Sequence, residues 1–404
     1  MKITGVEPIL CDRYYTFCKI TTDENIVGWG DGTEYFTPKS VASNITDFGR
    51  LIIGEDPRNI EKIWQLCWRS AWTGGKDLSA ALCAIESALW DIKGKLYGVP
   101  AIELMGGRIW DKVRLYTHGR GNTLEEVAKD AEQLKNEGWT AYKTSPVGLP
   151  NIYWGRDSTK LKGSIEWPYI SRNASLSSIK DTEAKVRTIR ETLGTEMEIC
   201  MDAGNSLDIP SAIRLAKALE PYKMFFLEDL ICQHEDAAPS YKRITESTST
   251  PIATGENLYT IWQFRSYLQI GALSILLPDI SHVGITQGKK IAALAEAYHL
   301  PICPHNPNSP LSNIQSANLV SSTPNFIALE FRHEYAFPEK DSWVEKIMNP
   351  PLSSMVKEGY LTLPDRPGWG VEMNEEEIAK HPYVEPCYVL NRLVEKQRTP
   401  SGWR

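Results

Sequence analysis

The sequence predicts an α/β protein in which a (β/α)₈ barrel follows a smaller α+β region. From about Val113, short apolar runs alternate with helix-like stretches of a dozen or more residues, the pattern of parallel strands joined by crossover helices. Eight such runs are present, and eight strands close a barrel. The length of 404 residues suits a barrel with a smaller partner. The candidate strands are residues 113–117, 139–144, 197–202, 224–228, 251–256, 274–279, 300–305 and 326–330.

Before the barrel, residues 1–112 predict a separate α+β unit. Residues 2–10 and 15–21 alternate like two strands of a meander. A helix is expected to begin at the N-cap Ser79 and to end before Gly98. Its apolar residues are spaced 3, 4, 3 and 4 apart, which is helical periodicity. These apolar residues are Leu82, Ile85, Leu89, Ile92 and Leu96.

Two segments lack the barrel rhythm. Residues 146–180 form a long connection rich in Trp and Tyr, and long loops in compact domains are usually functional or disordered. We interpret this connection as an active-site lid or a contact between subunits, with a disordered surface loop as the alternative. Residues 351–404 are expected to pack back against the N-terminal unit. The barrel then comprises residues 113–350.

Composition excludes several classes of function. Acidic residues number 51 and basic residues 44, so there is no electrostatic reason to expect binding to nucleic acid or to a membrane. No apolar run has the length of a membrane span, and the N-terminus has no signal-like apolar core. The eight cysteines are scattered without a CxxC pair. We therefore expect buried thiols in a reducing cytoplasm rather than disulfides or a zinc site.

Six successive candidate strands end in an acidic residue or a histidine. The separations are 26, 28, 23, 26 and 25 residues, which corresponds to one β/α unit each. In such barrels, catalytic groups lie at the C-terminal ends of the strands and converge on one mouth. We therefore expect the six side chains to share a pocket. They are Asp202, Glu228, Glu256, Asp279, His305 and Glu330.

Three of these groups predict a metal site. Asp202, Glu228 and Glu256 would repel one another if they lay side by side without a cation. An all-oxygen ligand set favours a hard divalent ion, Mg²⁺ or alternatively Mn²⁺. The competing interpretation is that one or more of these carboxylates pairs with Lys or Arg around the barrel rim.

The other three groups predict acid–base chemistry. Asp279 and His305 lie on neighbouring strands, and a carboxylate beside an imidazole sets its tautomer and raises its basicity. His305 is thus the candidate base, and Glu330 would hydrogen-bond a substrate oxygen if it stays protonated. A metal and a positioned imidazole are what removal of the proton next to a carboxylate requires. A hydroxyl on the β-carbon would then leave as water.

Motifs over nearly the whole chain carry a family resemblance. They are AYKTS with Lys143, MDAGN, FFLED, ATGEN, PDISHVG, PHNP and ALEF, together with SALWDIKGK, LMGG and PGWGVEM. On these motifs the sequence resembles the enolase superfamily, mandelate racemase subgroup. The resemblance implies a modified barrel capped by an α+β domain from both termini, with Mg²⁺ and an acid substrate at their interface. It also implies a homo-oligomer, from dimer to octamer.

Within this subgroup the sequence is similar to the galactonate and mannonate dehydratase types. The resemblance implies that His118 contacts substrate. Both types carry a histidine where this chain has Gly204, and a second lysine of the racemase pattern is replaced by Ser145. A two-base racemase is therefore disfavoured. The acid that protonates the leaving hydroxyl is either His305 itself, Lys143 or a residue of the long connection such as Tyr153.

Specificity is expected to come from the N-terminal unit, with Tyr35, Trp72 and Lys76 as candidates for contact with substrate. The leading hypothesis is dehydration of an aldonate or aldarate to a 2-keto-3-deoxy acid. A cycloisomerase or epimerase that uses the same intermediate is the first alternative. The second is a catalytically degenerate protein that binds a metal and an acid.

Overall fold

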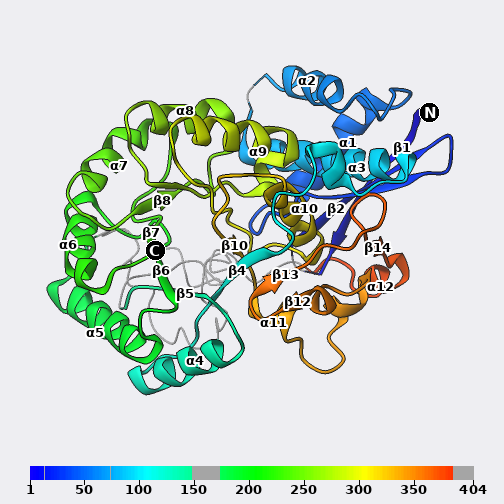
Figure 1. The fold of residues 1–404 in the computed structure, drawn as a ribbon. Coiled ribbons are helices and arrows are strands. Elements are labelled where there is room, and N and C mark those ends of the chain that lie inside the picture. The colour runs from blue at the N-terminus through cyan, green and yellow to red at the C-terminus, as the bar shows by residue number, and fades with distance from the viewer. Residues whose placement is uncertain (13, 73, 148–172, 385–404) are drawn as a thin grey trace, which may run out of the picture.

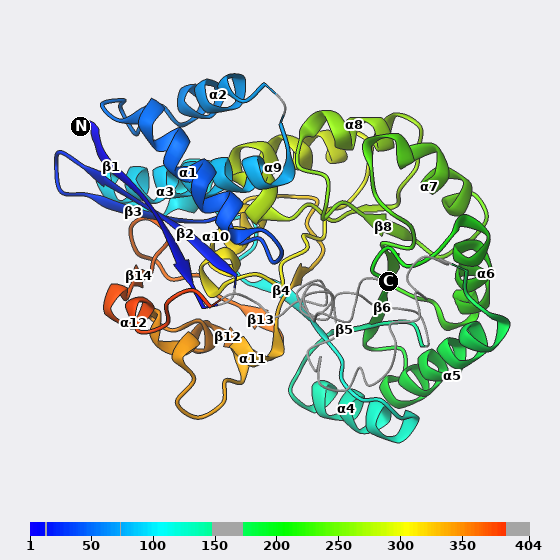
Figure 2. The same ribbon diagram turned by 180° about the vertical axis from the view of Figure 1, so that it is seen from behind.

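The computed structural model describes residues 1–12, 14–72, 74–147 and 173–384. The helices α4 to α8 form an arc around a set of short strands, and the N-terminal elements lie together at one side of that arc (Figures 1 and 2). The C-terminal elements lie beside the N-terminal ones. The predicted α/β architecture, a modified barrel with an α+β cap, is confirmed.

The barrel strands run parallel in chain order from β4 to β9, and β10 returns to pair with β4. Between β9 and β10, Ile302 bridges both Leu276 and Phe326 and completes the ring. The run at 300–305 is thus one bridge rather than a full strand, because Pro301 and Pro304 have no N–H to donate. The strands are β4 (Val113–His118), β5 (Ala141–Thr144), β6 (Glu198–Asp202), β7 (Phe226–Glu228), β8 (Ile252–Thr254), β9 (Ile275–Leu276) and β10 (Leu329–Glu330).

The interior of the barrel is filled with side chains from every position around the ring. These buried residues are Tyr116, Ala141, Cys200, Phe226, Ala253, Ile275, Leu277, Cys303 and Ala328. The helices outside are α4 (Leu124–Asn136), α5 (Leu176–Leu193), α6 (Ile209–Leu219), α7 (Ala238–Thr245), α8 (Ile261–Gln269), α9 (Ile280–Ala297) and α10 (Pro310–Ser321). Chemistry is thus confined to the ends of the strands.

The cap is an antiparallel meander covered by helices. Its elements are β1 (Ile3–Cys11), β2 (Tyr15–Thr22), β3 (Val27–Asp31), α1 (Pro38–Ile52), α2 (Ile60–Ser70) and α3 (Lys76–Tyr97). Sequence patterns did not predict β3, since Gly28 and Gly30 weaken a strand signal. Gly30 is required there because a Cβ would lie 1.9 Å from the carbonyl oxygen of Ala84 in α3.

The start of α3 differs from the prediction. The N-cap is Gly75 with φ of 134°, so the helix begins one turn before Ser79. The Ser79 hydroxyl instead donates to the backbone oxygen of His282 in α9, at 2.8 Å. The helix ends at Gly98 in the left-handed conformation, as predicted. The serine therefore joins the cap to the barrel and does not cap its own helix.

The C-terminal elements contact both larger parts. In the cap, the indole nitrogen of Trp369 donates to the backbone oxygen of Trp29 at 2.8 Å. In the barrel, Tyr360 and Leu361 pair with β4. The elements are α11 (His333–Ala336), β11 (Met348–Asn349), β12 (Val356–Lys357), β13 (Tyr360–Leu361), β14 (Glu372–Met373) and α12 (Glu375–Ala379).

Two negative findings concern only the part of the chain that the structure describes. Its helices include none with both the length and the apolar character needed to traverse a membrane. The seven cysteines in that part are free thiols, and all but Cys232 are buried.

Candidate active site

The six predicted side chains lie at the same end of the barrel. Asp202 and Glu228 are opposite one another in the register of β6 and β7. Glu330 ends β10, while Glu256 and Asp279 follow β8 and β9. The register of β4 and β5 brings His118 opposite Lys143. Backbone pairing alone therefore assembles groups that are up to 212 residues apart in the chain.

Lys143 is the centre of one half of this mouth. Its ammonium nitrogen lies 2.8 Å from Glu228 Oε2, 3.0 Å from Glu330 Oε1 and 3.4 Å from Asp202 Oδ2. Its side chain is fully buried. Burial alone would lower the pKa of Lys143, but the three carboxylates outweigh it and raise the pKa well above its usual value. Lys143 is therefore a firmly held cation, and its three donors all face carboxylates.

His305 is the centre of the other half. Its Nδ1 lies 2.7 Å from Asp279 Oδ2, and its Nε2 lies 2.9 Å from Glu256 Oε2. Burial disfavours the imidazolium, yet Glu256 and Glu330 outweigh it and raise the pKa of His305 well above its usual value. The hydrogen bond to Asp279 commits Nδ1 and leaves Nε2 as the nitrogen that faces the mouth.

The three carboxylates provide the oxygen ligands that a divalent cation prefers, but their side chains do not surround a single position for such an ion. Within the described residues, no three His, Cys, Asp or Glu side chains form a metal-binding cluster. Lys143 contacts Asp202 and Glu228, whereas Glu256 pairs with His305. This is in part the competing arrangement expected from sequence, in which a lysine compensates the carboxylates.

The surroundings of Glu228 fit a cation at this position. Both of its oxygens are buried, and neither accepts a hydrogen bond from any described residue, although Oε2 forms an ion pair with Lys143 at 2.8 Å. Burial, reinforced by Asp202 and Glu330, raises its pKa well above the usual value even though Lys143 opposes the shift. A carboxylate with unfilled acceptor positions beside two others is suited to an oxygen-preferring divalent ion.

Glu330 bears on one condition stated from the sequence. It would donate to a substrate oxygen only if its carboxyl stays protonated, and the structure surrounds this group with donors: Lys143, His118 and the backbone N–H of Asn306 at 3.1 Å. Burial favours protonation, but Lys143 and His305 outweigh it and hold the pKa of Glu330 well below its usual value. Glu330 is an anion that accepts hydrogen bonds, because cations reach it from neighbouring strands.

The residues predicted to contact substrate differ in whether they reach the barrel mouth. His118 reaches the mouth through Glu330, and burial together with Lys143 lowers its pKa. Tyr35 donates from its hydroxyl to the backbone oxygen of Pro307, two residues after His305. Trp72 is 97% exposed and does not line the mouth in this structure. Tyr153 lies outside the described residues.

Lys76 contacts the mouth together with residues that the sequence patterns did not single out. Its ammonium lies 3.0 Å from Glu34 Oε2 and 2.9 Å from Asn257 Oδ1. Glu34 Oε2 also lies 3.1 Å from His282 Nε2. The available signal was the position of His282, which comes three residues after Asp279 in the first turn of α9.

Both halves of the chain match family models. Residues 10–106 match the mandelate racemase/muconate lactonizing enzyme N-terminal domain, and residues 126–377 match the enolase C-terminal domain-like family. The sequence is 32% identical to a D-galactonate dehydratase of Variovorax paradoxus over all of this chain and 96% of that protein. It is 33% identical to a D-galactonate dehydratase of Pectobacterium atrosepticum, with the same coverage.

Solved structures agree with these matches. A member of the enolase superfamily from Salmonella Typhimurium has a TM-score of 0.83 at 27% identity, covering 94% of this chain and 98% of that one. The 3,6-anhydro-D-galactonate cycloisomerase of Zobellia galactanivorans has a TM-score of 0.79 at 25% identity, covering 94% and 99%. This chain therefore belongs to the mandelate racemase/muconate lactonizing enzyme family of the enolase superfamily, as the sequence motifs indicated.

Proposed function

We propose that this enzyme dehydrates a sugar acid, an aldonate or aldarate, to a 2-keto-3-deoxy acid by removing the proton next to the carboxylate. The observation that carries the proposal is the Asp279–His305 pair at the mouth, whose 2.7 Å contact at Nδ1 turns Nε2 toward the mouth, where it meets Glu256 at 2.9 Å. Two dehydratases at 32% and 33% identity over the full chain support the reaction class.

Asp202, Glu228 and Glu256 are proposed to hold a Mg²⁺ ion, with Mn²⁺ as a substitute. When bound, the ion would stabilise negative charge on the substrate carboxylate as the neighbouring proton leaves. Lys143, held by Glu330 at 3.0 Å, flanks this position and is proposed to place its positive charge beside the carboxylate end of the substrate. His118, Tyr35 and Lys76 are proposed to contact the substrate around the rim.

His305 is proposed to act twice. In its neutral form it first takes the α-proton at Nε2, and Asp279 supports the imidazolium that results. It then returns a proton to the hydroxyl that leaves from the β-carbon on the same face. Lys143 is a poor candidate for this second role, because its ammonium donates to Glu330 and lies within ion-pair distance of Asp202 and Glu228. Gly204 contributes no side chain to the opposite face.

The experiment is a panel of hexonates, pentonates and aldarates with Mg²⁺, assayed for 2-keto-3-deoxy products and for exchange of the α-proton with deuterium. His305→Asn should reduce exchange by at least about 100-fold, the usual contribution of a general base. The exposed His299→Asn is the matched control and should leave exchange unchanged. A wild-type enzyme that makes no keto product from any member contradicts dehydration.

Cycloisomerisation is the second candidate, because a structural neighbour with a TM-score of 0.79 is a cycloisomerase. The same exchange experiment separates the two reactions. Exchange together with an isomeric product, rather than a keto acid, would favour the cycloisomerase. Absence of exchange with every acid that binds would favour a protein without catalysis.

A further inference from the structure

The carboxylate of Asp279 lies between two histidines. Its Oδ2 accepts from His305 Nδ1 at 2.7 Å, and the same oxygen forms an ion-pair contact of 3.6 Å with His282 Nδ1, which also faces the backbone oxygen of Glu256 at 3.4 Å. Asn308 Nδ2 and the backbone N–H of Ser281 complete its surroundings. Asp279 is fully buried and His282 is 3% exposed. The second histidine therefore has no access to substrate but direct access to the group that orients the first.

The other edge of the His282 ring faces the cap. Its Nε2 lies 3.1 Å from Glu34 Oε2, and that oxygen is also 3.0 Å from the ammonium of Lys76. Glu34 is 3% exposed and follows β3, so it belongs to the cap. Lys76 continues the contact to Asn257, the neighbour of Glu256, at 2.9 Å. Oxygen acceptors thus face both nitrogens of the His282 ring. Those at Nδ1 belong to the barrel, and the one at Nε2, from Glu34, belongs to the cap.

We propose that Glu34 is a positioning residue for the reaction proposed above, acting on His305 through His282 and Asp279. Glu34 touches no reacting atom. It holds the His282 ring against Asp279 and so restricts the carboxylate that sets the tautomer and orientation of His305. Because Glu34 comes from the cap and Asp279 from the barrel, the base is fully oriented only when the cap sits on the barrel mouth.

The first arm of the test measures kcat and KM in Glu34→Ala, Glu34→Gln and the control Glu55→Ala. Glu55 is a cap glutamate paired with Lys62 at 2.6 Å, away from the barrel mouth. Loss of a residue that orients a catalytic group through one partner typically costs roughly 10- to 100-fold. We expect kcat to fall about tenfold in Glu34→Ala with KM within about twofold, because Lys76 keeps its contact with Asn257 at 2.9 Å.

Glu34→Gln should recover most of kcat, because the amide oxygen still accepts from His282 Nε2. Glu55→Ala should match wild type. A Glu34→Ala variant that keeps its kcat overturns the proposal, and so does one that raises KM alone, since that pattern belongs to a substrate contact. Melting temperatures recorded in parallel identify variants that have not folded.

The second arm combines Glu34→Ala with His282→Gln. If Glu34 acts through His282, adding Glu34→Ala to the His282→Gln enzyme lowers kcat little further, which is a non-additive cycle. Full additivity of the two effects overturns the route through His282. Melting temperatures are recorded for the single and double variants alike, so a loss of kcat that comes from loss of structure in the double variant is recognised.

The third arm does not depend on any substrate. Diethyl pyrocarbonate modifies accessible imidazoles, and mass spectrometry of the His305 peptide gives the rate for that residue alone. A His305 ring released from its orientation should react several-fold faster in Glu34→Ala than in wild type, and Glu55→Ala should not differ. Equal rates in Glu34→Ala and wild type overturn the proposal. An enzyme without dehydratase activity would contradict the proposed function and leave this arm intact.

Discussion

Two glutamates of the cap are buried against the same barrel helix, α9, and their pKa values are shifted in opposite directions. Glu34 meets His282 and Lys76; burial would raise its pKa, but these two partners outweigh burial and lower it well below the usual value. Glu86 accepts from the backbone N–H of Thr286 at 2.9 Å. Burial therefore dominates there and raises the pKa of Glu86 to about 7.

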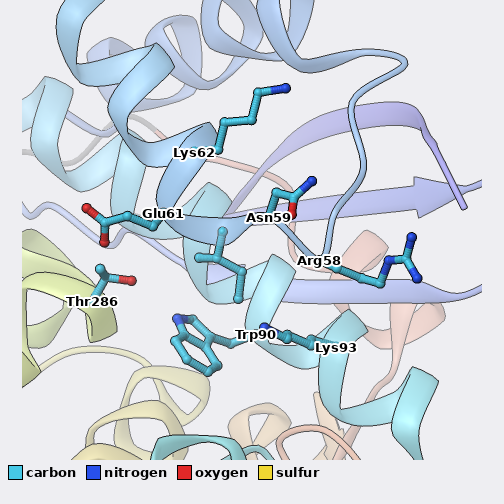
Figure 3. Close-up of a pocket in the computed structure, with 8 residues that line it drawn as sticks. Arg58, Asn59, Glu61, Lys62, Trp90, Lys93 and Thr286 are labelled. Carbon is cyan, nitrogen blue, oxygen red and sulfur yellow. The ribbon is translucent and has the colours of Figure 1, made fainter.

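The comparison teaches that burial alone does not set the pKa shift of these two carboxylates, because neighbouring cations reverse its direction at Glu34. Glu34 lies beside the barrel mouth, within ion-pair distance of Lys76 and His282. Glu86 lies at the outer seam between α3 and α9, near a surface hollow of about 330 Å³ (Figure 3). That hollow is lined by Trp90, Thr286 and Glu61 among others, and by none of the predicted site residues.

Removing the central cation of the mouth should have the largest effect. Lys143→Met leaves Asp202, Glu228 and Glu330 without their buried partner, and breaking such a group typically costs about 3–5 kcal/mol of unfolding free energy. Urea unfolding in EDTA measures the loss, and added Mg²⁺ should restore more stability to this variant than to wild type.

The matched control for that prediction is Lys185→Met. Lys185 is half-buried, and its ammonium donates to the backbone oxygen of Ser145 at 3.2 Å rather than to a carboxylate of the described residues. If Lys143→Met lowers the unfolding free energy no more than Lys185→Met does, then Lys143 is not required to stabilise the carboxylates at the mouth.

Glu86 should give a smaller, pH-dependent effect. Its folded pKa of about 7 exceeds the ordinary 4.5, so the native state holds the proton more tightly than the unfolded chain does. Its stabilisation is complete below about pH 4.5 and is lost as pH rises through about 7, a difference on the order of 3 kcal/mol. Glu86→Gln should remove this slope from urea unfolding measured between pH 5 and 8. An unchanged slope would mean that another group titrates.

Glu61 should give the smallest effect. It lines the same hollow and pairs with Lys290 at 2.8 Å, but the two side chains are 50% and 41% exposed. An exposed pair contributes about 0–1 kcal/mol, so Glu61→Ala should change the unfolding free energy by no more than that, and less in high salt. A larger loss would show that the outer seam also depends on a paired charge.

Spacing predicted much of this molecule because barrel geometry is periodic. One residue per β/α unit is sufficient to bring Asp202, Glu228 and Glu330 to one end, whatever the loops contain. The same reasoning anticipated the contact of His305 with Asp279. It did not anticipate Glu34, which has no periodic relation to the barrel and reaches it only because the cap packs on α9.

Local sequence alone determined which groups stand at the strand ends, since alternation and period are properties of neighbouring residues. Tertiary structure alone decided their charge and partners. The sequence left the protonation of Glu330 as a condition, and in the structure Lys143 and His305 outweigh burial and lower its pKa. The physical reason is that ionisation of a buried group depends on charges within a few ångströms, and here those charges come from residues that are distant in the chain.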